Sequence, residues 1–280
     1  MRDIEIFKLL ERYRYLPSTY IHAFVGGASS TRFKERLGDL FHEGYVDRPS
    51  QQWDFADARH SPAVYETGAR AARTLFDAGI MAGDRRTFLR EAAHRQYRHS
   101  LMICQILASL ELRARANPLL RFIGWSEILG RAPEATRSSI APFRLPVPSG
   151  GYLVPDGLFG LQYQAARPSY RFFAVEADRG TMPLLRTNSR QSSLIGKIEG
   201  YRAAYAAGQH RTNWGVPNLL VLVVTTEEAR ARSLLAACTS TGPAVLCRSV
   251  LIQDLKVPCP TLLTEPWDRV AGTPLSLTTP

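Results

Sequence analysis

The chain has 280 residues, a formal net charge of +10 and a hydrophobic fraction of 45%. This length suits one large domain or two ordinary ones, and the hydrophobic fraction is that of a soluble globular protein. No stretch approaches the roughly 18 consecutive apolar residues of a membrane-spanning helix, and the opening MRDIEIFKLLERYR lacks the cleavage pattern of a signal peptide. A basic surface favours polyanionic partners.

The four cysteines are Cys104, Cys238, Cys247 and Cys259. They form no CxxC pair, and no histidine cluster lies near them in the sequence, so the pattern does not favour a zinc site. We expect buried free thiols in a reducing compartment, which indicates a cytoplasmic protein.

The first 82 residues predict three helices followed by a hairpin. Apolar positions at helical spacing mark a first helix over 3–13, and Pro17 and Ser18 start a second. A third helix begins at Ser29 or Ser30 and carries a stripe of buried residues. Extended stretches near 45–46 and 64–65 complete an order that resembles the winged helix-turn-helix superfamily.

The third helix carries Arg32, Lys34 and Arg36 on its polar surface. In winged helices this helix enters the DNA major groove, so these three residues are the candidate DNA contacts. Glu35 and Asp39 share the surface. Two other interpretations therefore stay open: a solvated helix face, or a winged helix that docks a partner protein.

Two apolar runs in the second half, VPDGLFGLQY and FFAVEADRG, predict a strand hairpin with acids at its end. Glu176 and Asp178 alternate along one strand and share a face, and Asp156 can lie beside them on the neighbouring strand. Carboxylates this close repel each other, and a divalent cation resolves the repulsion. The pattern therefore indicates a site for Mg²⁺ or Mn²⁺.

A helix, SSLIGKIEGYRAAYAAG, follows, with Lys197 on a stripe of residues spaced four apart. The run NLLVLVV then reads as a strand buried on both faces. Helix, strands, helix and strand in this order predict an α+β or α/β fold, with a mixed sheet flanked by helices.

Several motifs together resemble the replication-relaxation family of plasmid and mobile-element proteins: YLPSTYIHAF, RLGDLFHEGYV, YETG, PDGLF, FAVEADRGT, KIEGYRAAY and EPW. The hairpin and its helix are similar to the core of the PD-(D/E)XK nuclease superfamily. The resemblance implies a winged-helix domain over 1–82 and a nuclease-like domain over 83–265. Residues 266–280 are expected to be a loose tail.

The resemblance implies a DNA-associated protein of replication or maintenance in which Asp156 and Glu176 hold Mg²⁺. The superfamily has a lysine at the position of Asp178, and Lys197 is the candidate replacement. A basic rim of Arg179, Arg186 and Arg190 would meet DNA phosphates.

Three functions follow from these motifs. The first is a metal-dependent DNA endonuclease or nickase. The second is a non-catalytic DNA-binding regulator whose nuclease-like domain is an assembly platform, which Asp178 in place of lysine favours. The third is a pure interaction protein.

Overall fold

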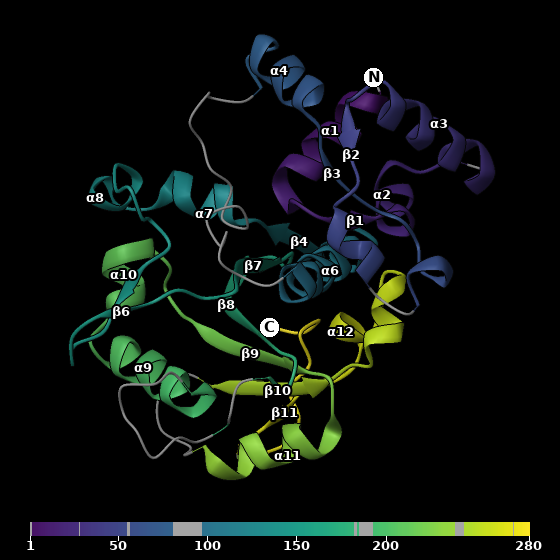
Figure 1. Ribbon diagram of the computed structural model, residues 1–280. Coiled ribbons are helices and arrows are strands. Elements are labelled where there is room, and N and C mark those ends of the chain that lie inside the picture. The colour runs from purple at the N-terminus through teal and green to yellow at the C-terminus, as the bar shows by residue number, and fades with distance from the viewer. Residues whose placement is uncertain are drawn as a thin grey trace. The chain divides into compact units, whose positions relative to one another are not determined.

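The computed structural model describes residues 2–27, 29–54, 57–80, 97–181, 184, 193–238, 244–270 and 272–280. The chain divides into two compact units (Figure 1). Unit 1 is Met1–Leu112 with Ile252–Cys259, and unit 2 is Arg113–Leu251 with Pro260–Pro280. None of the helices in the described ranges is long and apolar enough to cross a membrane.

Unit 1 is built from helices around a small antiparallel sheet with the strand order β1-β3-β2. Its helices and strands are α1 (Arg2–Tyr13), β1 (Leu16–Pro17), α2 (Ser18–Val25), α3 (Ser30–His42), β2 (Val46–Asp47), β3 (Val64–Thr67), α4 (Ala69–Asp77) and most of α6 (Tyr97–Arg115), together with the short 3₁₀ helices Ser50–Asp54, Ala58–His60 and Ile252–Lys256.

Helix α3 forms where the sequence predicts it. The Ser29 side chain accepts a hydrogen bond from the Arg32 backbone N–H at 3.2 Å, which satisfies one of the free donors at the helix start. Phe33, Leu37 and Leu40 recur on one face and are all buried. The opposite face is left to polar and charged residues, as the amphipathic pattern requires.

Residues 252–259 return to unit 1 after the chain has built most of unit 2. The Tyr20 hydroxyl lies 3.1 Å from the carbonyl oxygen of Leu255 and 2.8 Å from that of Val257, and Gln105 Nε2 donates to the Leu255 carbonyl at 2.6 Å. Gln105 belongs to α6, a helix that the sequence analysis placed in the second domain. No pattern in the sequence predicts that residues 252–259 belong to unit 1.

Gly68, in the YETG motif, is packed directly against backbone. Its N–H donates to the Tyr45 carbonyl at 2.9 Å, and a Cβ built at Gly68 would lie 2.6 Å from the Gly44 carbonyl oxygen. Gly68→Ala is therefore expected to lower the free energy of unfolding by about 1–3 kcal/mol, because backbone cannot move aside as a flexible side chain can. Urea denaturation measures the effect.

Gly38 supplies the matched control. It lies inside α3, and a Cβ built there meets no heavy atom within 4 Å. Gly38→Ala is expected to raise the free energy of unfolding by about 0.5–1 kcal/mol, since alanine restricts the unfolded chain and favours the helix. Equal stability of Gly68→Ala and wild type would contradict the packing argument.

Unit 2 contains a six-stranded mixed sheet with the order β11-β10-β9-β8-β7-β4. The pairs β8–β9 and β9–β10 are parallel, and the other neighbours are antiparallel. The elements are β4 (Leu120–Ile123), α7 (Trp125–Arg131), α8 (Glu134–Arg137), β5 (Leu145–Pro146), β6 (Tyr152–Leu153), β7 (Gly157–Tyr163), β8 (Ser169–Asp178), α9 (Leu194–Ala206), α10 (Gln209–Trp214), β9 (Leu220–Thr225), α11 (Glu228–Ala237), β10 (Val245–Ser249), α12 (Thr261–Thr264) and β11 (Asp268–Arg269). The predicted α+β class, with a mixed sheet flanked by helices, is confirmed.

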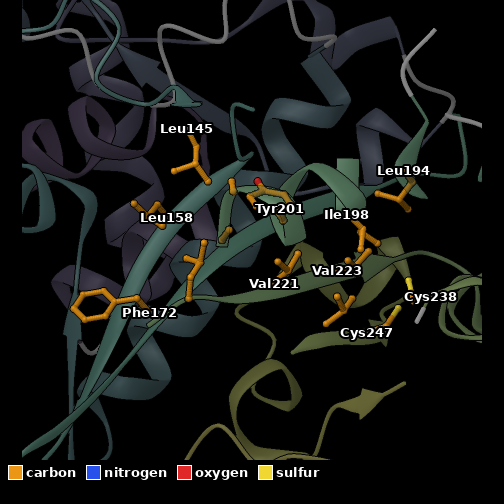
Figure 2. Packing of buried hydrophobic residues seen from close by; sticks show 14 of the residues in the cluster. Leu145, Leu158, Phe172, Leu194, Ile198, Tyr201, Val221, Val223, Cys238 and Cys247 are labelled. Atoms are coloured by element: carbon orange, nitrogen blue, oxygen red, sulfur yellow. The ribbon is translucent and has the colours of Figure 1, made fainter. Parts of the chain in front are cut away.

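Helices α9 and α11 cover one face of this sheet (Figures 1 and 2). The strands contribute every second residue to the shared core, as Val221 and Val223 of β9 show, because side chains alternate across a strand. Ile198 and Tyr201 from α9 and Leu234 from α11 pack onto these positions. The ends of the central strands therefore lie beneath the two helices.

The C-terminal residues do not form the loose tail that the sequence suggested. Strand β11 pairs with β10, and Trp267 and Leu277 are both fully buried. The Tyr163 hydroxyl donates to the Leu277 carbonyl at 3.0 Å, and the Trp267 indole donates to the Leu262 carbonyl at 3.0 Å. The expectation was wrong because it relied on the composition of the segment, in which threonines and prolines separate the buried Trp267 and Leu277.

Candidate functional site

Asp156 lies at the entrance of β7, beside the end of β8. Its backbone N–H donates to the Val175 carbonyl at 2.9 Å, and its Oδ2 accepts the Ala177 N–H at 2.9 Å. These bonds extend the predicted hairpin between β7 and β8 and fix the carboxylate next to the strand that carries Glu176. Asp156 and Glu176 are both buried.

Helix α9 places a cation and a phenol on Glu176. Lys197 Nζ forms an ion pair with Glu176 Oε2 and lies 3.8 Å from Asp156 Oδ1. The Tyr201 hydroxyl donates to Glu176 Oε1 at 2.6 Å. Positions four apart on a helix share a face, so the stripe seen in the sequence delivers Lys197 and Tyr201 to the same carboxylate.

The buried position of Glu176 changes its acidity. Burial disfavours the charged form and raises the pKa of Glu176 to about 7; the neighbouring Asp156 carboxylate adds to the rise. The positive charge of Lys197 and the hydrogen bonds from Lys197 and Tyr201 act in the opposite direction. Near neutral pH, Glu176 is thus poised between its protonated and ionised forms.

Asp178 shares the sheet face with Glu176 but meets a different helix. Arg230 of α11 forms an ion pair with it through Nε and Oδ2, and Arg230 Nη2 donates to Oδ1 at 3.0 Å. The Gly180 N–H also donates to Oδ1 at 3.0 Å. Arg230 was missed by the sequence analysis, because no spacing within EEARARSLL relates it to a residue on β8.

Within the described ranges, no three aspartate, glutamate, histidine or cysteine side chains gather as a metal-binding group. The residues that the structure brings together are two carboxylates, Asp156 and Glu176, with Lys197 and Tyr201. The part of Asp178 in binding a metal stays a prediction.

The predicted basic rim is described only in part. Arg179 is half-buried directly after β8. Arg186 and Arg190 lie outside the described residues. Contact of these three arginines with phosphate stays a prediction.

The three basic residues of α3 differ in their surroundings. Arg32 and Lys34 are exposed. Arg36 instead donates to both carboxylate oxygens of Asp3 on α1, from Nη2 at 2.8 Å and from Nε at 3.3 Å. It also lies 3.8 Å from Asp39. The surface that α3 presents as free positive charge is therefore centred on Arg32 and Lys34.

No curated protein and no solved structure gives a significant match to this chain. A family model described as replication-relaxation matches residues 7–220, which include α3, the β7–β8 hairpin and α9, and with them Asp156, Glu176, Lys197 and Tyr201. Because the match covers most of the chain, the protein belongs to the replication-relaxation family.

Proposed function

We propose that this protein binds DNA in the replication or maintenance of a plasmid or mobile element, and that unit 2 carries a metal-dependent endonuclease or nicking site. The observation that carries the proposal is the convergence of Lys197 on Glu176 and Asp156. Two acids and a lysine at the end of a strand hairpin are the functional groups of a PD-(D/E)XK site. In the proposed site Lys197 of α9 takes the role of the superfamily's lysine, whose position is occupied by Asp178 in this chain.

Unit 1 supplies the DNA-reading part of the proposal. Its order of helix, strand, two helices and two strands, with the sheet order β1-β3-β2, supports the assignment of a winged helix. In this fold α3 is the recognition helix. The exposed Arg32 and Lys34 are its candidate contacts, and Arg36 can join them only by leaving Asp3.

The donor set fits Mg²⁺ or Mn²⁺. Mg²⁺ is bound through one or two carboxylates, keeps several waters and takes its remaining ligands from phosphate, so Asp156 and Glu176 are sufficient. When bound, such an ion polarises a scissile phosphate and lowers the pKa of a water nucleophile. Lys197 is placed to offset the negative charge of the substrate, and Tyr201 holds Glu176 in orientation. Asp178 would join the ligands only on release from Arg230.

The decisive experiment incubates supercoiled and linear DNA with the protein and Mg²⁺ or Mn²⁺. Wild type is expected to nick or cleave, and Asp156→Ala is expected to lose the activity while duplex binding is retained. Glu134→Ala removes an exposed acid of α8 and serves as the matched control. Absence of cleavage with either metal, with DNA binding intact, would remove the nuclease from the proposal.

The DNA-reading role of α3 has its own test. Replacing Arg32 and Lys34 together with glutamine is expected to weaken duplex binding and to reduce the slope of log K against log salt by about 2, since each phosphate contact contributes roughly 0.9. Fluorescence anisotropy over a salt series measures both. Arg73→Gln, an exposed site on α4, is the control. Unchanged affinity and slope in the double variant would exclude α3 as the DNA contact.

A second candidate function is a non-catalytic DNA-binding protein whose unit 2 is an assembly platform. It is favoured by the two ion pairs, Lys197 with Glu176 and Arg230 with Asp178, which already compensate the buried acids without a metal. Mg²⁺ separates the two functions. A rise in Tm with Mg²⁺ that is lost in Asp156→Asn supports the metal site, and equal Tm values with and without Mg²⁺ or Mn²⁺ support the platform.

A further inference from the structure

An exposed arginine and an exposed tyrosine are stacked on the β5–β6 hairpin. The guanidinium carbon of Arg144 lies 4.0 Å from the centre of the Tyr152 ring, and about half of the Tyr152 surface is open to solvent. In the described part of the chain, no carboxylate pairs with Arg144, and the Tyr152 hydroxyl has no hydrogen-bond partner. The neighbouring Arg131 and Arg137 are each paired with a glutamate. Among the described residues, Arg144 is thus a positive charge with no carboxylate partner.

The hairpin is held firmly beneath this pair. Phe143 and Leu145, on either side of Arg144, are buried. Asn213 Nδ2 of α10 donates to the Arg144 carbonyl at 2.7 Å. These contacts fix the backbone that carries Arg144, which lowers the part of the entropy cost of ligand binding that comes from backbone ordering.

Helix α9 links the hairpin to the candidate site. Leu153, next to Tyr152, packs against Gly200 so closely that a Cβ there would lie 3.1 Å from Leu153 Cδ2. Gly200 immediately precedes Tyr201 and follows Lys197 by less than one helical turn. Along the chain, only three residues separate Tyr152 from Asp156. The hairpin that carries the exposed pair therefore packs on the helix that contributes Lys197 and Tyr201 to the candidate site, and it lies close to Asp156 along the chain.

We propose that the Arg144–Tyr152 pair binds single-stranded DNA, with one base stacked on Tyr152 and Arg144 against an adjoining phosphate. A half-exposed aromatic ring beside a guanidinium that no described carboxylate pairs with suits a ligand that offers both a planar ring and an anion. In a duplex the base faces are covered by their neighbours, so only a single strand or an unpaired junction presents them. This inference rests on the proposed function and narrows its substrate to DNA that is at least locally single-stranded.

The test is equilibrium binding of fluorescent oligothymidylate to the full-length protein in EDTA, by anisotropy. Tyr152→Ala is expected to weaken binding on the order of 10-fold or more, because stacking on one base is lost. Tyr152→Phe keeps the ring and is expected to bind like wild type. Arg144→Gln is expected to weaken binding and to lower the slope of log K against log salt by about 0.7, the value for one phosphate contact on a single strand.

Tyr170→Ala is the matched control. Tyr170 is an exposed tyrosine of unit 2 near the start of β8, while Glu176 is near its end. Single-strand affinity of Tyr152→Ala equal to that of wild type, or an equal loss in Tyr170→Ala, overturns the inference, as does failure of wild type to bind the oligonucleotide. If the pair instead docks a protein partner, Tyr152→Ala would bind the oligonucleotide as wild type does.

Binding in EDTA does not depend on cleavage, so the two proposals fail separately. If Asp156→Ala and wild type are equally inactive but Tyr152→Ala loses single-strand affinity, the binding site stands and the nuclease does not. If cleavage depends on Asp156 while Tyr152→Ala binds normally, the nuclease stands and the binding site does not.

Discussion

In the absence of divalent metal, Glu176→Gln is expected to abolish a loss of stability that wild type shows as the pH rises from about 4.5 to about 7. Burial raises the pKa of Glu176 from an ordinary 4.5 to about 7, so the folded state holds this proton more tightly than the unfolded state. Between these two values the free energy of unfolding falls as the pH rises, by up to about 3 kcal/mol. Urea denaturation over this pH range measures it.

Two further variants test the cause. Lys197→Met removes the charge that lowers the pKa of Glu176, so the fall in stability should continue to a higher pH than in wild type. Glu127→Gln is the control: hydrogen bonds from Arg121 lower the pKa of Glu127, so its contribution to stability changes only below its ordinary pKa of 4.5, and its removal leaves the fall between pH 4.5 and 7 intact. A wild type with flat stability from pH 4.5 to 7 would show that Glu176 is not held in a desolvated site.

The part of the site that could be predicted from the sequence is the part set by local periodicity. Alternation along β8 puts Glu176 on one face, and the spacing of four along α9 puts Lys197 and Tyr201 on one stripe. A short connection makes β7 and β8 antiparallel neighbours, which brings Asp156 to the end of β8. Each of these placements depends on a short stretch of sequence, and the structure contains all of them.

The contacts that could not be predicted join residues far apart in sequence. Asp178 was grouped with Glu176 because both share a face, but which helix covers each position depends on how α9 and α11 pack. The sequence predicts Arg36 as a DNA contact, whereas in the structure its guanidinium donates to the carboxylate of Asp3 on α1. Periodicity gives the face of a side chain and says nothing of its partner across the core.

Arg230→Ala is expected to be the most destabilising single change around the site, with a loss of about 3–5 kcal/mol in the free energy of unfolding. The side chain of Asp178 is only 4% exposed, so removal of Arg230 leaves a buried carboxylate whose remaining hydrogen-bond donor among the described residues is the Gly180 N–H. The cost is the desolvation of an uncompensated charge, and the lost attraction is the smaller part. Thermal and urea unfolding would both report it.

The double variant Asp178→Asn with Arg230→Ala separates that cost from simple loss of side-chain packing. It removes both charges, so it should recover much of the stability lost in Arg230→Ala, and the coupling follows from the double-mutant cycle. If the double variant is as unstable as Arg230→Ala, packing and not charge holds α11 on the sheet.

The single variant Asp178→Asn tests whether Asp178 is a ligand of the proposed metal ion. Arg230 is partly exposed and can turn to solvent, so this variant should fold with a smaller loss of stability. If Asp178 serves only the ion pair, its Mg²⁺-dependent rise in Tm and its DNA cleavage should match those of wild type, while Asp156→Asn loses both. Loss of both in Asp178→Asn would instead mean that Arg230 releases the carboxylate when a metal binds, which would restore the three-acid site that the sequence predicts.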